Sequence, residues 1–164
     1  MRRDEGSGQA FRVLENVVFL HGTPLFAGVH TDEIRAIASI AEELSFDPGE
    51  VIVRENDVGD SLYLIKDGSV RIEKKIDERK SIELAELKTG ECFGDMSVFD
   101  AEVRSASVIA GTTCSLLRVG GEELLDVILE SPYIAIELLK MFVKRLRNAD
   151  ARIQELTARL EGRG

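Results

Sequence analysis

Turn signals recur at intervals of roughly ten residues between positions 45 and 119, and this spacing limits what the chain can fold into. The signals are Pro48-Gly49, Asp67-Gly68 and Thr89-Gly90, together with the polar stretches 57–60 and 77–80. Short runs rich in β-forming residues separate them: 50–54, 62–66, 70–75, 82–87, 105–110 and 114–119. Many short strands joined by evenly spaced turns predict a β-sandwich or barrel and argue against a parallel βαβ sheet.

Helical spacing replaces the strand pattern on both sides of this region. Before it, the clearest helical stretch is 31–44, where apolar residues line one face. Thr31 can cap this helix, and Asp32 and Glu33 favour the positive end of its dipole. After the last predicted strand, helical spacing returns over 124–129 and then in a longer stretch. We therefore expect an α+β chain, mainly β, with helices before and after a barrel.

The last predicted helix has an unbroken heptad pattern. Ser131-Pro132 supplies a capping residue and a first-turn proline, and no Gly or Pro follows before Gly162. Apolar residues then alternate three and four positions apart: Leu139, Phe142, Leu146, Ala149, Ile153, Leu156 and Leu160. A seam about 30 Å long reaches beyond a small barrel, which predicts a parallel coiled-coil homodimer. The alternative is a stripe that packs only on its own domain.

Charge and composition argue against several classes of function. The net charge is −9, and residues 132–164 hold seven basic and four acidic side chains, so the rest of the chain is strongly acidic and suits nucleic acid poorly. The longest apolar runs reach about four residues, whereas a membrane span needs roughly twenty, and the N-terminus has no apolar leader. We therefore expect a cytoplasmic chain with no membrane span and no DNA-reading domain.

No pattern of catalytic or metal-binding residues stands out. Cys92 and Cys114 have no second Cys or His at ligand spacing, so we expect no metal site. His21 and His30 are isolated, and the sequence shows no Ser-His-Asp set. We therefore expect a protein that is not an enzyme and has no cofactor.

One segment, 90–107, interrupts the strand pattern. Gly94 permits an unusual backbone conformation and the close approach of a ligand, and the next five residues can form a helical turn whose amides point at an anion. Arg104 can bind a phosphate through two parallel hydrogen bonds. Asp95 can accept a hydrogen bond from a sugar hydroxyl. Together these residues predict a compact site for a phosphorylated sugar within a β-barrel.

This segment resembles the phosphate-binding cassette of cyclic nucleotide-binding domains, a family that includes regulatory subunits of cAMP-dependent protein kinase, the catabolite activator protein and cyclic nucleotide-gated channels. The residues that match are Phe93, Gly94, Met96, Ser97, Arg104, Ser105, Ala106 and Ser107. The stretches 48–52, 59–65 and 67–70 also match, and the resemblance covers about residues 18–150. Two features differ: Asp95 stands where the family usually has Glu, and the loop 100–103 lacks the usual Gly and Pro.

The resemblance implies a double-stranded jelly-roll barrel with N-terminal helices and a long C-terminal helix. It implies an N-terminal helical segment over residues 1–43 and a barrel over 44–119 that contains the cassette, 93–107. Residues 120–164 would then form a hinge helix followed by a dimerisation or lid helix.

The resemblance also implies roles for individual residues. Arg104 would bind the cyclic phosphate with help from Ser105, and Asp95 would bind the ribose 2′-hydroxyl. Backbone groups would come from Gly94, Met96 and Ser97, in a cassette that begins at Phe93. The candidates for the apolar wall under the purine are Val70, Ile72, Leu84 and Ala85.

The implied function is a cyclic-nucleotide sensor. Binding would draw the cassette inward, repack Met96 against Leu124 or Leu125, and swing the last helix over the base from a hinge before Pro132. Ser105, where guanine-selective members often have Thr, favours cAMP over cGMP. The effector would be a separate protein or a further domain of a longer chain. The alternative is a degenerate domain that binds no nucleotide and serves for dimerisation or docking.

Overall fold

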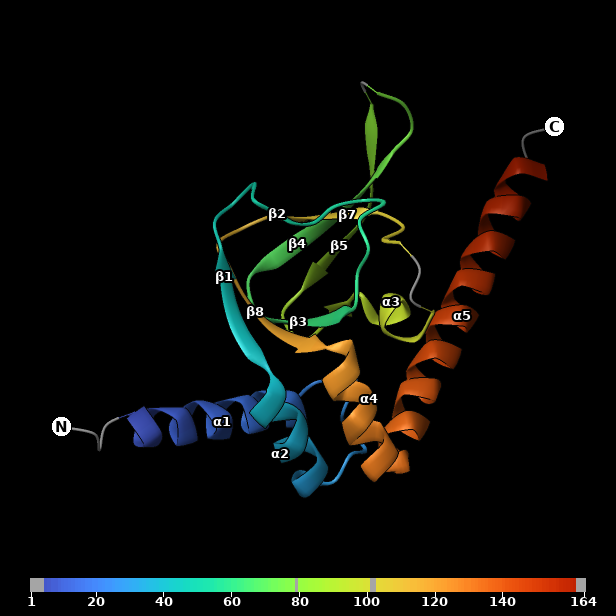
Figure 1. Ribbon diagram of the computed structural model, residues 1–164. Helices are drawn as coiled ribbons and strands as arrows, with labels where there is room; N and C mark the ends of the chain where they lie inside the picture. The colour runs from blue at the N-terminus through green and yellow to red at the C-terminus, as the bar shows by residue number, and fades with distance from the viewer. Residues whose placement is uncertain (1–4, 79, 101–102, 162–164) are drawn as a thin grey trace.

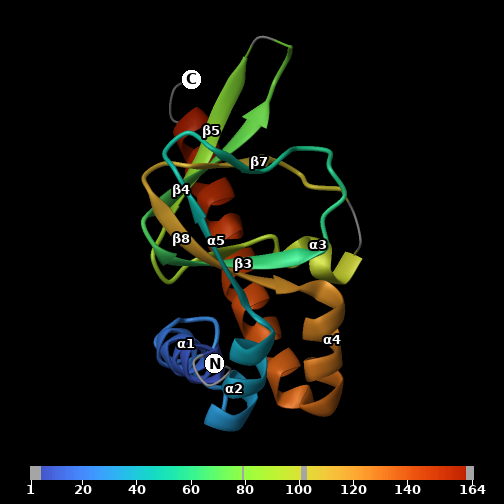
Figure 2. The same ribbon diagram turned by 60° about the vertical axis from the view of Figure 1, so that its left-hand side comes forward.

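The computed structural model describes residues 5–78, 80–100 and 103–161, and two four-stranded antiparallel sheets form its centre (Figure 1). The first sheet has the order β1-β8-β3-β6, and its strands are β1 (Glu42–Phe46), β8 (Cys114–Gly120), β3 (Ser61–Asp67) and β6 (Cys92–Phe93). The second has the order β2-β7-β4-β5, and its strands are β2 (Val51–Val53), β7 (Ser107–Ala110), β4 (Ser69–Lys75) and β5 (Ser81–Lys88). The two sheets form the predicted jelly-roll barrel, and the β4–β5 hairpin projects beyond it (Figure 2).

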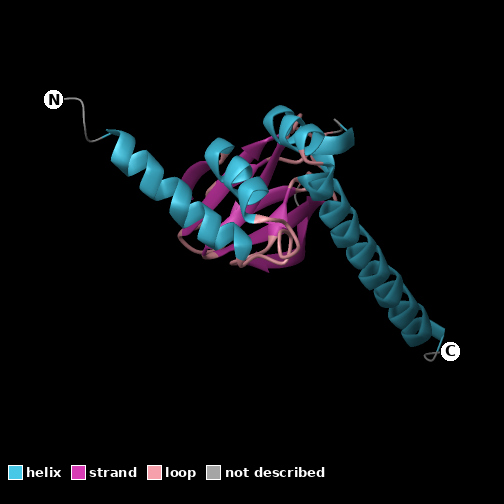
Figure 3. Ribbon diagram, turned by 90° about the horizontal axis from the view of Figure 1, so that it is seen from below, coloured by secondary structure: helices cyan, strands magenta, loops and turns pink. Residues whose placement is uncertain are grey.

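Most of the helices gather at one end of this barrel, a short one lies beside β3, and the last runs from that end along the side of the barrel (Figure 1). They are α1 (Glu5–His21), α2 (Thr31–Ile40), α3 (Asp95–Asp100), α4 (Gly121–Glu130) and α5 (Pro132–Glu161). Figure 3 shows that α1 and α5 point outward on opposite sides of the barrel. No described helix combines the length and the apolar composition that crossing a bilayer requires.

Strand β3 connects the two hydrophobic cores. Because side chains alternate along a strand, Leu62 and Leu64 pack in the cluster shared with the helices, and Tyr63 and Ile65 pack in the cluster inside the barrel. All four residues are at most 9% exposed. The continuous apolar run of β3 therefore reflects a strand that is covered on both faces.

The prediction of one helix over 31–44 was wrong at its end. Helix α2 stops at Ile40, and Leu44 lies in β1, where it pairs with Leu116 of β8. The spacing of apolar residues continued the helical pattern by chance. Pairing with β8 decides the conformation of this segment, because backbone hydrogen bonds to a neighbouring strand outweigh weak helix propensities.

A small polar cluster clamps the start of α5 to α2. Pro132 is the first residue of α5, as expected, but the Ser131 hydroxyl does not cap the helix and instead donates to the Glu33 carboxylate. The backbone N–H of His30 also donates to Glu33, at 2.9 Å, and the His30 ring lies 5.5 Å from that of Tyr133. The hydrogen bond from Ser131 is the main reason that the pKa of Glu33 lies below its usual value.

We expect Glu33→Gln to lower the thermal unfolding midpoint at pH 7 by about 2 °C, because it weakens the clamp. A carboxyl group with a lowered pKa in the fold stabilises it above the unfolded pKa of about 4.3, and this contribution is lost as the pH falls through the folded pKa. The difference from the wild type should therefore shrink as the pH falls below the unfolded pKa and disappear once Glu33 is protonated in the folded state. Asp32→Asn, in the same exposed first turn, is the matched control. An equal effect of Asp32→Asn would mean that only the helix dipole is involved.

Candidate functional site

A cavity of about 280 Å³ lies between the second sheet, the β6–α3 segment and helix α5. The segment 91–97 lines one side, and Arg104, Ser105 and Ala106 line another. Arg145 reaches it from α5. The second sheet, the segments 91–97 and 104–106, and helix α5 therefore converge on one hollow, although they are far apart in sequence.

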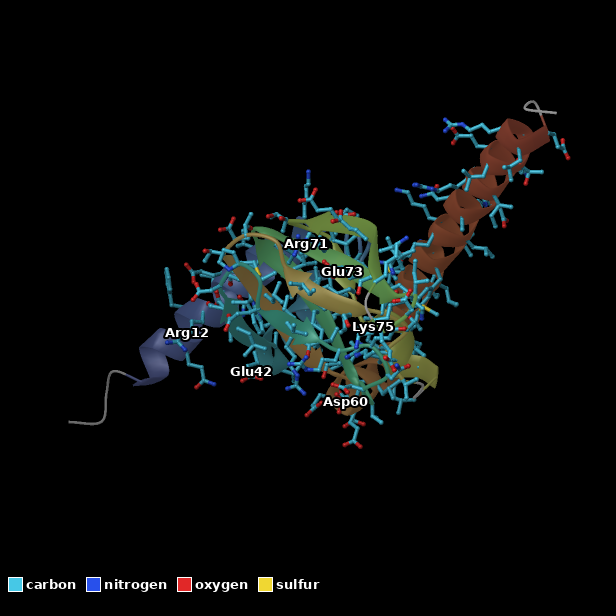
Figure 4. All side chains as sticks on the ribbon, turned by 90° about the horizontal axis from the view of Figure 1, so that it is seen from above. Arg12, Glu42, Asp60, Arg71, Glu73 and Lys75 are labelled. Carbon is cyan, nitrogen blue, oxygen red and sulfur yellow. The ribbon has the colours of Figure 1, made fainter. Side chains whose placement is uncertain are left out.

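A larger hollow of about 660 Å³ lies between α1, α2 and the start of β1, away from the cassette. Figure 4 labels two of its lining residues, Arg12 on α1 and Glu42 on β1. Two of its polar side chains already bind Lys66 of β3, which contacts Glu43 at 3.0 Å and Asn16 at 3.3 Å. These contacts fasten α1 to the barrel, so we treat the smaller hollow as the candidate site.

Arg104 lines the smaller cavity, and neutral groups hold its guanidinium. The residue is only 6% exposed. Nη2 donates to the Ser61 carbonyl at 2.9 Å, and Nη1 lies 3.2 Å from both the Gly94 carbonyl and the Ser97 hydroxyl. No ion pair among the described residues includes Arg104. Burial lowers its pKa, but guanidinium groups stay charged in proteins, so the site keeps an unbalanced positive charge.

Two glycines leave the room that Arg104 occupies. A Cβ on Gly59 would lie 1.9 Å from Nε of Arg104. A Cβ on Gly94 would lie 2.5 Å from the Ser61 carbonyl oxygen and 2.6 Å from Nη1, and Gly94 also has a φ of +81°. Sequence reasoning assigned a backbone role to Gly94 but none to Gly59, because nothing in the sequence shows that residue 59 lies against residue 104.

Asp95, the first residue of α3, is already bound within the chain. It is 4% exposed, and its Oδ2 accepts a hydrogen bond from Nη1 of Arg145 at 2.6 Å. Nη2 of Arg145 donates to the Cys92 carbonyl at 3.1 Å and lies 3.3 Å from Cys92 Sγ. Sequence reasoning assigned no role to Arg145, because nothing in the sequence shows that residue 145 lies against residue 95.

The other cassette residues that the sequence singled out also lie here. Phe93 stacks on Tyr63 with ring centroids 4.9 Å apart, and Ser105 lines the cavity. Met96 is 62% exposed and lies in a groove between α3 and α5. The residues Ala101 and Glu102 of the cassette loop lie outside the described residues.

The apolar lining differs from the wall that the sequence suggested. Ile72 lines the cavity, and Val53, Leu87 and Val108 join it. The three other candidates, Val70, Leu84 and Ala85, are not among the lining residues. Val70 is fully buried in the interior core, whereas Leu84 is 51% exposed on the hairpin. Ala85 pairs with Ile72, but the register between β4 and β5 shifts at the next position, and Leu84 has no partner on β4.

This arrangement of a buried arginine, a glycine turn and a short helix within a jelly-roll barrel agrees with the comparison to known families. The family model named cyclic nucleotide-binding domain matches residues 43–131. The chain belongs to the cyclic nucleotide-binding domain family.

Similar proteins in this family include bacterial and fungal regulators. The cyclic AMP receptor protein of Thermus thermophilus is 33% identical over 138 residues, which are 84% of this chain and 64% of that protein. The crystal structure of the Thermus thermophilus catabolite activator protein has a TM-score of 0.74 at 33% identity, covering 82% of this chain and 63% of that one. A cAMP-dependent protein kinase regulatory subunit of Emericella nidulans is 30% identical over 102 residues, 62% of this chain and 24% of that protein. The chain thus spans less than two thirds of each of these proteins.

Cys92 marks the contact between the cassette and α5 of this cyclic nucleotide-binding domain. Its Sγ lies 3.9 Å from Sδ of Met141 on α5, and the residue is 4% exposed. Burial raises the pKa of the Cys92 thiol to about 11. The thiol is therefore neutral and poorly reactive near pH 7 as long as α5 covers it.

We expect Gly59→Ala to lower the free energy of unfolding by about 1–3 kcal/mol, because its Cβ would overlap the Arg104 side chain. Adding Arg104→Ala removes the overlap, so the double variant should lose less than the sum of the two single losses. Urea unfolding of the four proteins measures this. Strict additivity would mean that Gly59 and Arg104 do not depend on each other.

Proposed function

We propose that this chain is a cyclic-nucleotide sensor module that binds cAMP and transmits binding to helix α5. One observation carries the proposal: Arg104 places a buried positive charge, which forms no ion pair with any described carboxylate, beside a cassette that also holds a sugar-hydroxyl acceptor. The relatives named cyclic AMP receptor protein and cAMP-dependent protein kinase regulatory subunit support it. The role is regulatory rather than catalytic, and the location is cytoplasmic.

The cyclic phosphate would bind Arg104. Its three hydrogen bonds to Ser61, Gly94 and Ser97 fix the guanidinium before a ligand arrives, so little side-chain entropy remains to be lost. A buried charge with only neutral partners is costly, and an anion relieves that cost. The Ser105 hydroxyl lies along the same wall and would assist.

The ribose and the base would occupy the rest of the cavity. The carboxylate of Asp95 would accept the 2′-hydroxyl, and backbone groups of Gly94, Met96 and Ser97 would surround the sugar phosphate. The purine would pack on Ile72, together with the apolar residues that join it in the lining. Ser105 in place of Thr favours cAMP over cGMP.

Arg104→Ala should weaken cAMP binding by about ten- to a hundredfold, because a charge-assisted hydrogen bond contributes roughly 1.5–3 kcal/mol. Isothermal titration calorimetry measures this, with Arg54→Ala, an exposed arginine at the end of β2, as the control. The three hydrogen bonds of Arg104 mean that Arg104→Ala also costs some stability. Arg104→Lys, which keeps the charge but not the paired donors, should bind with intermediate affinity. Unchanged affinity in a folded Arg104→Ala would contradict the proposed phosphate site.

The second candidate function is a degenerate domain that binds no nucleotide and serves for dimerisation or docking. It is favoured by the ion pair that already occupies Asp95 and by the internal hydrogen bonds of Arg104. Titration with both cAMP and cGMP separates the two candidates. Absence of heat and of thermal stabilisation with either nucleotide would select the second.

Helix α5 is the proposed dimerisation element in both cases. Of the heptad residues, five are at least half exposed: Leu139, Leu146, Ile153, Leu156 and Leu160. The helix extends past the barrel in Figure 1, so its own domain leaves that part of the seam uncovered. An apolar stripe of this length is typical of a coiled coil.

Truncation after Arg147 should convert a dimer into a monomer, because it removes the part of the seam beyond the barrel. Multi-angle light scattering over a range of concentrations measures the association. A truncated chain that dimerises with the affinity of the full chain would place the interface elsewhere.

A further inference from the structure

We propose that Arg145 is an internal competitor for the ribose position: its guanidinium occupies the Asp95 carboxylate in the ligand-free chain and leaves it when a nucleotide binds. The inference rests on the proposed nucleotide site and deepens it. It adds a residue, and a mode of regulation, that sequence reasoning did not assign.

The ion pair between Arg145 and Asp95 is short and stands alone. The distance from Nη1 to Oδ2 is 2.6 Å, and the Asp95 side chain is only 6% exposed. Among the described residues, it is the single ion pair between α5 and the rest of the chain, since the two others on α5 join residues of the same helix. Arg145 is therefore the charged link between the cassette and α5.

The guanidinium covers the carboxylate that a sugar hydroxyl would need. Arg145 binds Asp95 with one nitrogen and the Cys92 carbonyl with the other, so it spans the β6–α3 turn. The same side chain lines the cavity, whose volume of about 280 Å³ lies at the lower end of the range for small-molecule sites. A nucleotide gains both space and an acceptor when Arg145 withdraws.

Release of Arg145 from Asp95 requires little rearrangement of the surrounding protein, because the Arg145 side chain is not fully buried. The side chain is 44% exposed, so the guanidinium is already partly hydrated and can move fully into water. The Asp95 carboxylate is itself buried, so another donor must replace the departing guanidinium, and the ribose hydroxyl would supply it. Burial acts to lower the pKa of Arg145, but Cys92 and Asp95 raise it by more, so the group stays charged and can re-form the pair.

Withdrawal of Arg145 would also loosen α5. The neighbouring contacts are the approach of Met141 to Cys92 and an edge-on contact between Phe142 and Phe99, whose ring centroids are 6.0 Å apart. These contacts are apolar and non-directional, so they do not fix the position of α5 as an ion pair does. Competition at Asp95 therefore connects occupancy of the site to the position of α5, as a two-state contact does in other switches.

The first test compares Arg145→Gln with Arg147→Gln, which makes the same charge change on an exposed part of α5. Arg145→Gln should bind cAMP about fivefold more tightly than the wild type, equivalent to about 1 kcal/mol, and Arg147→Gln should bind as the wild type does. With 2′-deoxy-cAMP, which cannot use Asp95, the gain should largely disappear. Equal or weaker cAMP binding by Arg145→Gln would overturn the proposal, because Arg145 would then be neutral or would support the site.

The second test needs no nucleotide. Alkylation by iodoacetamide at pH 8, followed by peptide mass spectrometry, reports exposure of Cys92 under α5, and Cys114, buried in the interior core, is the internal control. Arg145→Gln should raise the labelling rate of Cys92 severalfold and leave that of Cys114 unchanged. No change at Cys92 in Arg145→Gln would overturn the link between Asp95 and α5.

The two tests separate the inference from the proposed function. Wild type that binds cAMP, with no gain in Arg145→Gln, refutes the competitor alone. If neither the wild type nor Arg145→Gln binds a cyclic nucleotide, the proposed function is refuted, and so is competition between Arg145 and the ribose for Asp95. Cys92 labelling then decides only whether Arg145 holds α5 in place. If both cysteines become reactive, the variant is unfolded, and Arg145→Met, which removes the charge but keeps a long side chain, takes its place with the same expected directions.

Discussion

The buried guanidinium of Arg104 imposes requirements on every segment around it. It needs acceptors inside a barrel, and the carbonyls of Ser61 and Gly94 supply them because β3 and the β6–α3 turn meet at this point. It also needs space, which is why residues 59 and 94 have no side chain. Since its acceptors are neutral, the positive charge stays available to an anion. The charge of Arg104, the β6–α3 turn and the two glycines therefore depend on one another.

Helix α5 is attached to the domain at two different places. One attachment is a hydrogen-bonded clamp and the other is an ion pair. At its start, Pro132 follows a segment clamped to α2 through Glu33 and Ser131, next to residues of the main core. Further along, the Arg145–Asp95 pair is the charged contact with the cassette. A helix clamped at its start and held further along by one ion pair can pivot when that pair opens, which suits a regulatory element.

Exposed apolar residues lie on two neighbouring surfaces of the domain. The seam of α5 beyond the barrel is one such surface, and the groove lined by Met96, Phe99 and Phe142 continues it toward the cassette. A dimer through α5 would therefore lie directly against the helix that carries Asp95. Dimerisation and nucleotide binding would then influence each other through shared contacts.

The sequence by itself determined the barrel, the flanking helices and the cassette. These features depend on local signals: regular turns, alternating strands, and a glycine, an acid and an arginine at fixed spacing. It failed at residues 42–44, where only pairing with β8 distinguishes a strand from the end of a helix. It also missed Gly59 and Arg145, whose roles arise from contacts between segments distant in the chain. The tertiary structure alone decided which carboxylate is already occupied and which apolar residues reach the cavity, because both depend on how separate elements pack.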